Sequence, residues 1–187
     1  MDFPGLGFIL APFVSVRGAA FDIRISDFHR RLMKNFDYLE PKTVAEACAL
    51  LKQHGGEAKV FAGGAHLTIL MKQGLLEPKS LVNIKKLPEL KGIRYDDATG
   101  LTIGALVTHR ELETSALVKE KFPVLCQAER EVANIRVRNM GTVGGNLASG
   151  EPLTDLAQIF IALDGKVKIA GPSVHRMIPI EELFVDF

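Results

Sequence analysis

Residues 36–84 show a strand–helix–strand–helix–strand pattern, and this order constrains the fold more than any other feature of the chain. "FDYLEP" alternates apolar and polar residues, as expected of a half-buried strand. "AKVFAGG" is expected to be a strand that runs into a glycine pair, and "SLVNI" a third strand. Strands joined through helices pair in parallel with right-handed crossovers. We therefore expect residues 33–85 to form a subdomain with a small parallel sheet covered by two helices, in an α+β protein.

The first of these helices has clear end signals. Thr43 followed by Glu46 has the spacing of a capping box, and Gly55 is a typical helix terminator. Its apolar residues recur at helical spacing: Val44, Ala47, Cys48 and Leu51.

The pattern changes after residue 85. "GIRYD" and "LTIGAL" flank "DATG", which predicts an antiparallel hairpin with Asp96 and Asp97 as turn residues. Helices are expected in "THRELETSAL", "FPVLCQAEREVAN" and "TDLAQIFIAL", the first opened by Thr108 and Glu111, and a closing hairpin in "KVKIA" and "HRMIPI". "TVGGNLAS" is expected to be a strand or an extended loop. Residues 86–187 are thus expected to form a second, mixed subdomain, shortened at its C-terminal end.

Within residues 1–32, the stretch 1–21 is apolar, but several Pro and Gly residues interrupt it before the length of a membrane span is reached. Arg24, Arg30 and Arg31 then follow among apolar residues. Asp2 also argues against the basic start of a secretory signal. We expect a leader or extension here, and a targeting or membrane-surface helix is the alternative.

Charge and cysteine content exclude several functions. The formal net charge of +1 argues against a nucleic-acid-binding protein and against a polybasic membrane anchor. Cys48 and Cys126 stand alone, so we expect no zinc site, no iron–sulfur cluster and no other metal site within the chain. Two lone cysteines are typical of a reducing, cytoplasmic setting.

Two glycine pairs carry the main indication of function, in "VFAGGAHL" (residues 60–67) and "GTVGGNLAS" (residues 141–149). Glycines at a turn before a helix allow consecutive backbone amides to converge on an anion, and a diphosphate suits such a cradle. Tight turning alone is the alternative explanation. Neither pair fits the Rossmann or the P-loop motif.

Other polar residues near the glycine pairs have open roles. Asp155 either caps a helix or accepts hydrogen bonds from ribose or ribityl hydroxyls. His66 has no second histidine at metal-ligand spacing. Arg136 and Arg138 alternate with apolar residues, which places both on one face, toward phosphate, a protein partner or water.

Taken together, "MKNFDYLEPKTVAEACALLKQHGGEAKVFAGGAHLTILMKQG", "LVNIKKLPELKGI", "LTIGALVTHRELE" and "IRVRNMGTVGGNLASGEPLTDLA" resemble the FAD-binding medium subunit of the molybdenum hydroxylase family. The resemblance covers residues 33–187 and implies an FAD-binding fold of the vanillyl-alcohol-oxidase (PCMH) type. FAD would lie between the two subdomains, with its diphosphate on both glycine loops. The implied contacts are Val60, Phe61, Ala62, Gly63, Gly64, Ala65, His66, Leu67, Thr142, Val143, Gly144, Gly145, Asn146 and Asp155. The backbone amides of residues 142–146 are expected to hold the phosphate.

The resemblance also implies a redox role without catalytic residues for the organic substrate in this chain. Electrons would pass from the iron–sulfur clusters of a small subunit through FAD to NAD, a quinone or another acceptor. A large molybdopterin-binding subunit would oxidise the substrate, in a heterotrimer or a dimer of heterotrimers. Two rival functions are a truncated, flavin-free assembly or scaffold module of the same fold and a stand-alone flavin oxidase.

Overall fold

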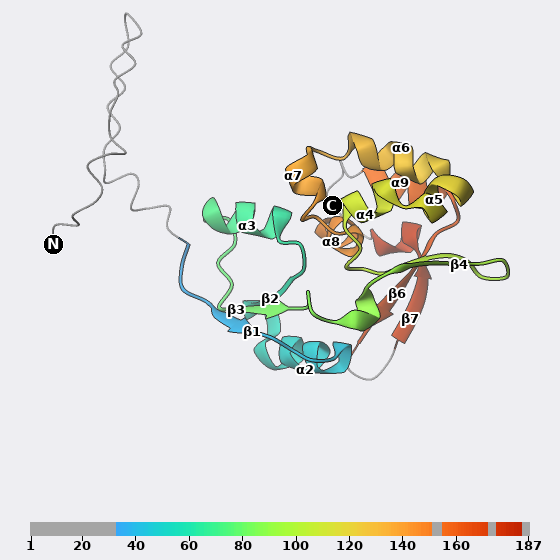
Figure 1. Cartoon of the computed structure of the whole chain (residues 1–187). Helices are drawn as coiled ribbons and strands as arrows, with labels where there is room; N and C mark the ends of the chain where they lie inside the picture. Colours follow the sequence, from blue (N-terminus) through green and yellow to red (C-terminus); the bar gives the residue numbers. More distant parts are fainter. Residues whose placement is uncertain (1–32, 151–154, 172–174, 185–187) are drawn as a thin grey trace, which may run out of the picture. The chain divides into compact units, whose positions relative to one another are not determined.

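A parallel sheet of three strands, in the order β1-β3-β2, lies in the first part of the chain. The computed structural model describes residues 33–150, 155–171 and 175–184 (Figure 1). β1 is Asp37–Leu39, β2 is Ala58–Phe61 and β3 is Ser80–Asn83, and every residue of β3 is buried because it is the central strand. The predicted parallel sheet is confirmed.

Helix α2, Val44–His54, packs on this sheet. The Thr43 hydroxyl accepts the Glu46 amide at 3.1 Å, as its position before the helix predicts. The Glu46 carboxylate, however, accepts the Lys42 amide at 2.7 Å, so the expected reciprocal capping box is only half formed. Gly55, at φ 55°, ends the helix as predicted.

Two antiparallel hairpins frame the second part of the chain. β4 (Ile93–Asp96) pairs with β5 (Gly100–Ile103), and β6 (Lys166–Ala170) pairs with β7 (His175–Pro179). The Asp96 carboxylate accepts the Ala98 and Thr99 amides, at 2.9 and 3.0 Å, and so fixes the first turn. Both predicted hairpins are confirmed.

The helices of the second part lie between the two hairpins in sequence. They are α4 (His109–Thr114), α5 (Ala116–Lys121), α6 (Pro123–Glu131), α7 (Ile135–Arg138), α8 (Val143–Ser149) and α9 (Asp155–Ala162). The complete capping box of Thr108 and Glu111 opens α4, as predicted. The prediction of one helix over "THRELETSAL" is wrong, because Ser115 is extended and its hydroxyl accepts the Val118 amide, which starts α5.

Among the described residues, buried apolar side chains form two clusters. The first contains Ala47, Ala58, Val82 and Leu87; the second contains Val107, Leu112, Val118, Leu125, Cys126, Val143, Leu156, Phe160 and Ile180. They divide near the boundary expected between residues 85 and 86, while Met33–Phe187 forms one compact unit. The two subdomains therefore remain a prediction.

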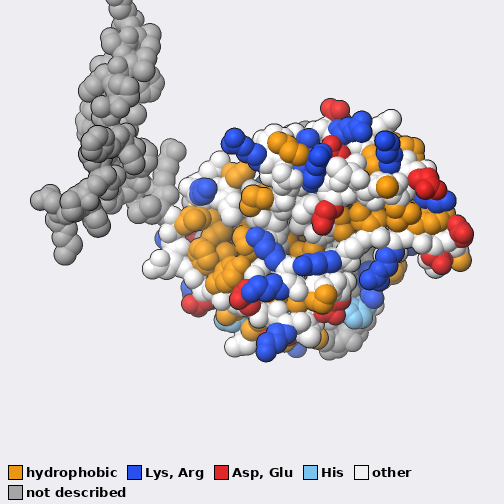
Figure 2. All heavy atoms as spheres, viewed as in Figure 1, with side chains coloured by type: hydrophobic (Ala, Val, Ile, Leu, Met, Phe, Trp, Pro, Cys, Tyr) orange, Lys and Arg blue, Asp and Glu red, His pale blue; other side chains and the backbone are white. Residues whose placement is uncertain are grey.

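The surface combines apolar and basic areas. Figure 2 shows Lys and Arg side chains near the middle of one face, beside stretches of hydrophobic surface. Tyr38, Val60, Ile69 and Leu75 are among the exposed large apolar residues. Within the described ranges, none of the helices combines the length and the apolar character that crossing a membrane requires.

Candidate functional site

The first glycine loop joins β2 to helix α3, Ala65–Lys72. Gly64 is the N-cap of α3 at φ 79°, a left-handed conformation that side chains disfavour. A Cβ on Gly64 would also lie 2.5 Å from the Phe61 ring. In the described part of the chain, the amides of Gly63, Gly64 and Ala65 donate no hydrogen bond, and no side chain caps the helix. These amides are therefore available to an anion at the positive end of the helix dipole.

The second glycine loop differs from its prediction, because "TVGGNLAS" forms helix α8 rather than a strand or extended loop. Thr142 is the N-cap, and its hydroxyl accepts the Gly145 amide at 3.1 Å. Gly144 is a packing glycine, because a Cβ there would lie 2.7 Å from the Ala105 Cβ. Thr142 is a residue type that favours the N-cap position, and this local signal starts the helix.

The amides of α8 are already engaged within the chain. Val143 donates to the Val107 carbonyl at 2.9 Å, Gly144 to the Ala105 carbonyl at 3.0 Å, and Asn146 to the Thr142 carbonyl at 2.8 Å. With the Gly145 amide on Thr142, these donors are not free to hold a phosphate. The Thr142 amide has no acceptor among the described residues, and the Asn146 side-chain oxygen is buried without a partner there.

The two glycine loops touch each other. An added Cβ at Gly63 would collide with the carbonyl oxygen of Met140 and would lie 3.0 Å from the Gly141 Cα. A cavity of about 350 Å³ opens at this contact, and Ala62, Gly63 and Thr142 line it. Three sequence-predicted residues from distant segments thus line one cavity.

Most of the remaining predicted residues do not line the cavity. They are Val60, Phe61, Gly64, Ala65, His66, Leu67, Val143, Gly144, Gly145 and Asn146. Asp155 is the first residue of α9, and its side chain lies outside the described part of the structure, so capping and ligand contact stay open for it. The FAD contacts expected of these residues stay predictions.

Several lining residues were not predicted from sequence. They are Lys85, Lys91, Gly92, Leu106, Val107, Thr108, Glu111, Asn139 and Met140. Thr108 and Glu111 already stood out as a capping pair, and "NIKKLPELKGI" is rich in lysine. Only the fold shows that these segments reach the glycine loops.

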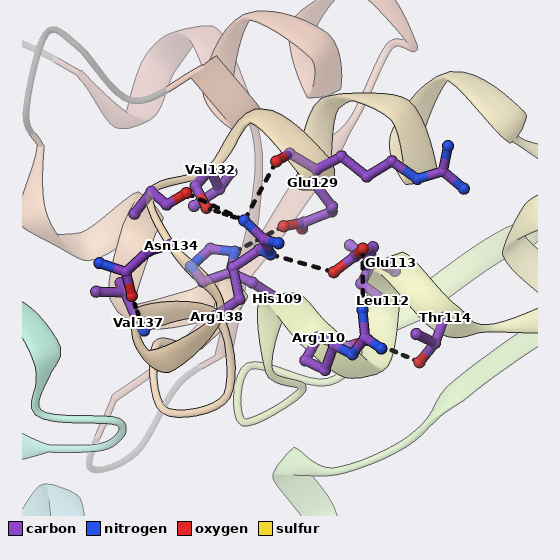
Figure 3. A network of polar contacts seen from close by, with 12 residues as sticks. His109, Arg110, Leu112, Glu113, Thr114, Glu129, Val132, Asn134, Val137 and Arg138 are labelled. Carbon is purple, nitrogen blue, oxygen red and sulfur yellow. Dashed lines mark hydrogen bonds and ion pairs between the residues drawn. The ribbon is translucent and has the colours of Figure 1, made fainter.

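A buried polar pair lies beneath the second loop (Figure 3). His109 of α4 and Glu129 of α6 are 3% and 0% exposed, and His109 Nδ1 lies 2.9 Å from Glu129 Oε2. Burial raises the pKa of the Glu129 carboxyl above its usual value, while the hydrogen bond and charge of His109 act in the opposite direction. The other carboxyl oxygen of Glu129, Oε1, has no partner among the described residues. Glu129 thus belongs to the buried face of α6, together with Leu125 and Cys126.

His109 connects this pair to the second loop. Its amide donates to the Gly141 carbonyl at 3.1 Å, and a Cβ on Gly141 would lie 2.9 Å from the His109 ring. Gly141 follows Met140, whose carbonyl contacts Gly63. The Glu129–His109 pair therefore supports the segment that contacts the first glycine loop.

The prediction that both arginines lie on one face is wrong, because residues 135–138 form the one-turn helix α7, in which residues two apart point in different directions. Arg138 Nε donates to Glu113 at 3.1 Å, and its Nη1 donates to the carbonyls of Val132 and Ala133, both at 3.0 Å (Figure 3). Arg138 thereby holds the turn after α6. No contact of the Arg136 side chain is found within the described residues.

Glu113 completes this network. Burial opposes its ionisation, but the hydrogen bond and charge of Arg110, together with those of Arg138, lower the pKa of the Glu113 carboxyl below its usual value. Arg110 and Arg138 lie 3.0 and 3.1 Å from its two oxygens. Glu113 is therefore an ionised anchor between α4 and α7.

These observations define a class of protein, an α+β domain with two glycine loops that meet at a cavity holding free amides and lysines. Such a cavity suits a phosphate-bearing ligand. Comparison with known proteins identifies the family: residues 34–187 match the model described as "FAD binding domain in molybdopterin dehydrogenase". The chain belongs to this family, whose cofactor is FAD.

Individual relatives agree with this assignment. The carbon monoxide dehydrogenase medium chain of Hydrogenophaga pseudoflava is 39% identical over 150 residues, covering 80% of this chain and 52% of the relative. The xanthine dehydrogenase FAD-binding subunit of Escherichia coli O157:H7 is 32% identical over 143 residues, covering 76% and 49%. The chain spans about half the length of these relatives.

Solved structures show the same fold. Carbon monoxide dehydrogenase from Hydrogenophaga pseudoflava, in a form lacking the Mo-pyranopterin moiety of its cofactor, aligns with a TM-score of 0.80 at 38% identity. The alignment covers 82% of this chain and 53% of that one. Quinoline 2-oxidoreductase from Pseudomonas putida 86 aligns with a TM-score of 0.76 at 29% identity, covering 80% and 52%.

Proposed function

We propose that this chain is the FAD-binding part of the medium subunit of a molybdenum hydroxylase. It holds FAD between its two glycine loops, in a fold of the PCMH type. The observation that carries the proposal is the contact of Gly63 with Met140, which brings both loops to one cavity lined by Ala62 and Thr142. Family membership supplies the identity of the cofactor.

The residues around the cavity fit a dinucleotide. The open amides of Gly63, Gly64 and Ala65 face no acceptor among the described residues, and they suit a phosphate oxygen. The Thr142 amide and the Asn146 side chain are the donor and acceptor left open on the second loop. The close backbone approach at Gly63 and Gly144 leaves no room for side chains between the loops and their neighbours.

The proposed role is electron transfer within a complex. Bound FAD supplies a carrier that takes up and releases electrons, and this chain binds and orients it. The partners are a small iron–sulfur subunit that delivers electrons and a large molybdopterin subunit that oxidises the organic substrate, with NAD or a quinone as acceptor. We also propose a cytoplasmic location, which the two unpaired cysteines support.

The visible absorption spectrum tests this proposal. We expect the purified chain, incubated with FAD and then desalted, to retain flavin absorption bands in stoichiometric amount. Riboflavin serves as a matched ligand control, because it has the flavin ring without the diphosphate that the loops are proposed to bind. A colourless protein that remains folded and cannot be reconstituted would contradict the proposal and favour a flavin-free scaffold of the same fold.

A further inference from the structure

Two lysines of the cavity wall have no acidic partner. Lys85 follows β3 and Lys91 follows the 3-10 turn Pro88–Leu90, and both line the cavity at the glycine loops. Within the described ranges, neither forms an ion pair. The neighbouring Lys86, by contrast, lies 2.9 Å from Glu40 and does not line the cavity. The chain thus places an unpaired and a paired lysine side by side.

Lys85 is held next to the first glycine loop. Its Nζ lies 4.2 Å from the centroid of the Phe61 ring, within the range of a cation–π contact. The same ring packs beneath Gly64, and the Lys85 amide donates to the Asn83 side chain at 3.1 Å. The aromatic ring and the turn after β3 therefore keep this ammonium group beside the open amides of α3.

The acidic group of the cavity wall is already engaged. Glu111 is the only acid among the described residues that line the cavity. One of its oxygens accepts both the amide and the hydroxyl of Thr108, at 2.7 and 2.9 Å. With two lysines and one occupied carboxylate, the described part of the wall carries an excess of positive charge, which favours an anion.

We propose that Lys85, assisted by Lys91, neutralises the diphosphate of FAD bound at the glycine loops. The inference rests on the proposed function and adds to it two charged side chains that the sequence reading did not assign to the site. The amides of α3 and the lysine ammonium then approach the same phosphate oxygens from β2–α3 and from the segment after β3. This contribution is Coulombic, so added salt weakens it.

The test compares Lys85→Gln, Lys91→Gln and the control Lys86→Gln, which all remove one exposed positive charge. FAD affinity is measured by equilibrium dialysis at low and at high salt. We expect Lys85→Gln to weaken FAD binding about 3- to 10-fold at low salt. Lys91→Gln should have a smaller effect of the same kind, and Lys86→Gln should stay within about twofold of the parent. The effect of Lys85→Gln should shrink as salt is added.

The outcomes separate this inference from the proposed function. Equal losses in Lys85→Gln and Lys86→Gln, or a loss that salt does not alter, would overturn the role of Lys85 while FAD binding by the parent stands. A parent chain that binds no FAD would overturn both. Thermal unfolding of the three variants checks that each is folded. We expect all three to fold, because all three lysine side chains are at the surface.

Discussion

Gly63 has no space for a side chain, and the reason lies outside its own loop. The Met140 carbonyl occupies the place that a Cβ would take. The glycine pair can be recognised in the sequence, but its contact with the Met140 carbonyl cannot, because local sequence patterns do not report contacts between distant segments. The same holds for Gly144, which packs on Ala105.

We predict that Gly63→Ala separates the two loops. The added methyl group should lower the free energy of unfolding by about 1–3 kcal/mol, as overpacking does, and should weaken FAD binding at the same time. Urea unfolding and FAD titration measure the two effects. Gly56→Ala is the control, since a Cβ there has no atom within 4 Å. Equal behaviour of the two variants would refute the contact between the loops.

The one-turn helix α7 was not predicted from the sequence. Its residues alternate between apolar and charged, which is the pattern of a strand. The Asn134 side chain accepts the amides of Arg136 and Val137, at 3.0 and 3.2 Å, and so starts a helical turn. Elements with long periodic patterns, such as α2 and α9, were predicted correctly, whereas short elements set by one cap were not.

Arg138 is expected to stabilise this element through its planar guanidinium. Arg138→Lys retains the charge, but its single nitrogen cannot replace both Nε, which donates to Glu113, and Nη1, which donates to the carbonyls of Arg130, Val132 and Ala133. It should therefore lower the free energy of unfolding by about 1.5–3 kcal/mol. Arg136→Lys on the same turn should change it by less than about 0.5 kcal/mol. Chemical denaturation of both variants measures the difference. Similar losses would show that Arg138 does not act through this network.

At the scale of the whole molecule, the buried Glu129 links stability to pH. Because its pKa is raised above the usual 4.5, the folded chain binds its proton more tightly than the unfolded chain does. The stability contributed by Glu129 is therefore fully present below about pH 4.5 and is lost as pH rises through the folded pKa. Glu113 has a lowered pKa, so its contribution to the free energy of unfolding depends on pH in the opposite sense. That contribution is present above the usual pKa of a glutamate and is lost as pH falls through the lowered pKa of the folded chain.

The variant Glu129→Gln isolates this effect. Glutamine keeps an oxygen toward His109 but does not titrate, while Glu113 remains in both proteins. We expect the unfolding free energy of the parent minus that of the variant to decrease with rising pH, in urea titrations from about pH 4 to about pH 8. His109, Glu113 and Arg138 are the charged or titratable groups acting on this carboxyl. A difference that stays constant over this range would show that Glu129 does not titrate as described.

The overall plan of the chain was largely predictable from the sequence. The parallel sheet and both hairpins follow from local periodicity and turn residues, and the two glycine loops stood out as the candidate site. The cavity, its lysines and the pair of His109 and Glu129 depend on contacts between segments far apart in sequence. Such long-range contacts cannot be predicted from the periodicity of the sequence.

The contact of Gly63 with the Met140 carbonyl also bears on the order of folding. The first glycine loop belongs to a strand–helix–strand unit whose contacts are short in sequence, and it can form early. The second loop reaches it only after the hairpin and helices between them have closed a long stretch of chain. We therefore expect the cavity between the loops to be among the last parts of the chain to form. A ligand bound there stabilises the finished fold more than any intermediate along the way.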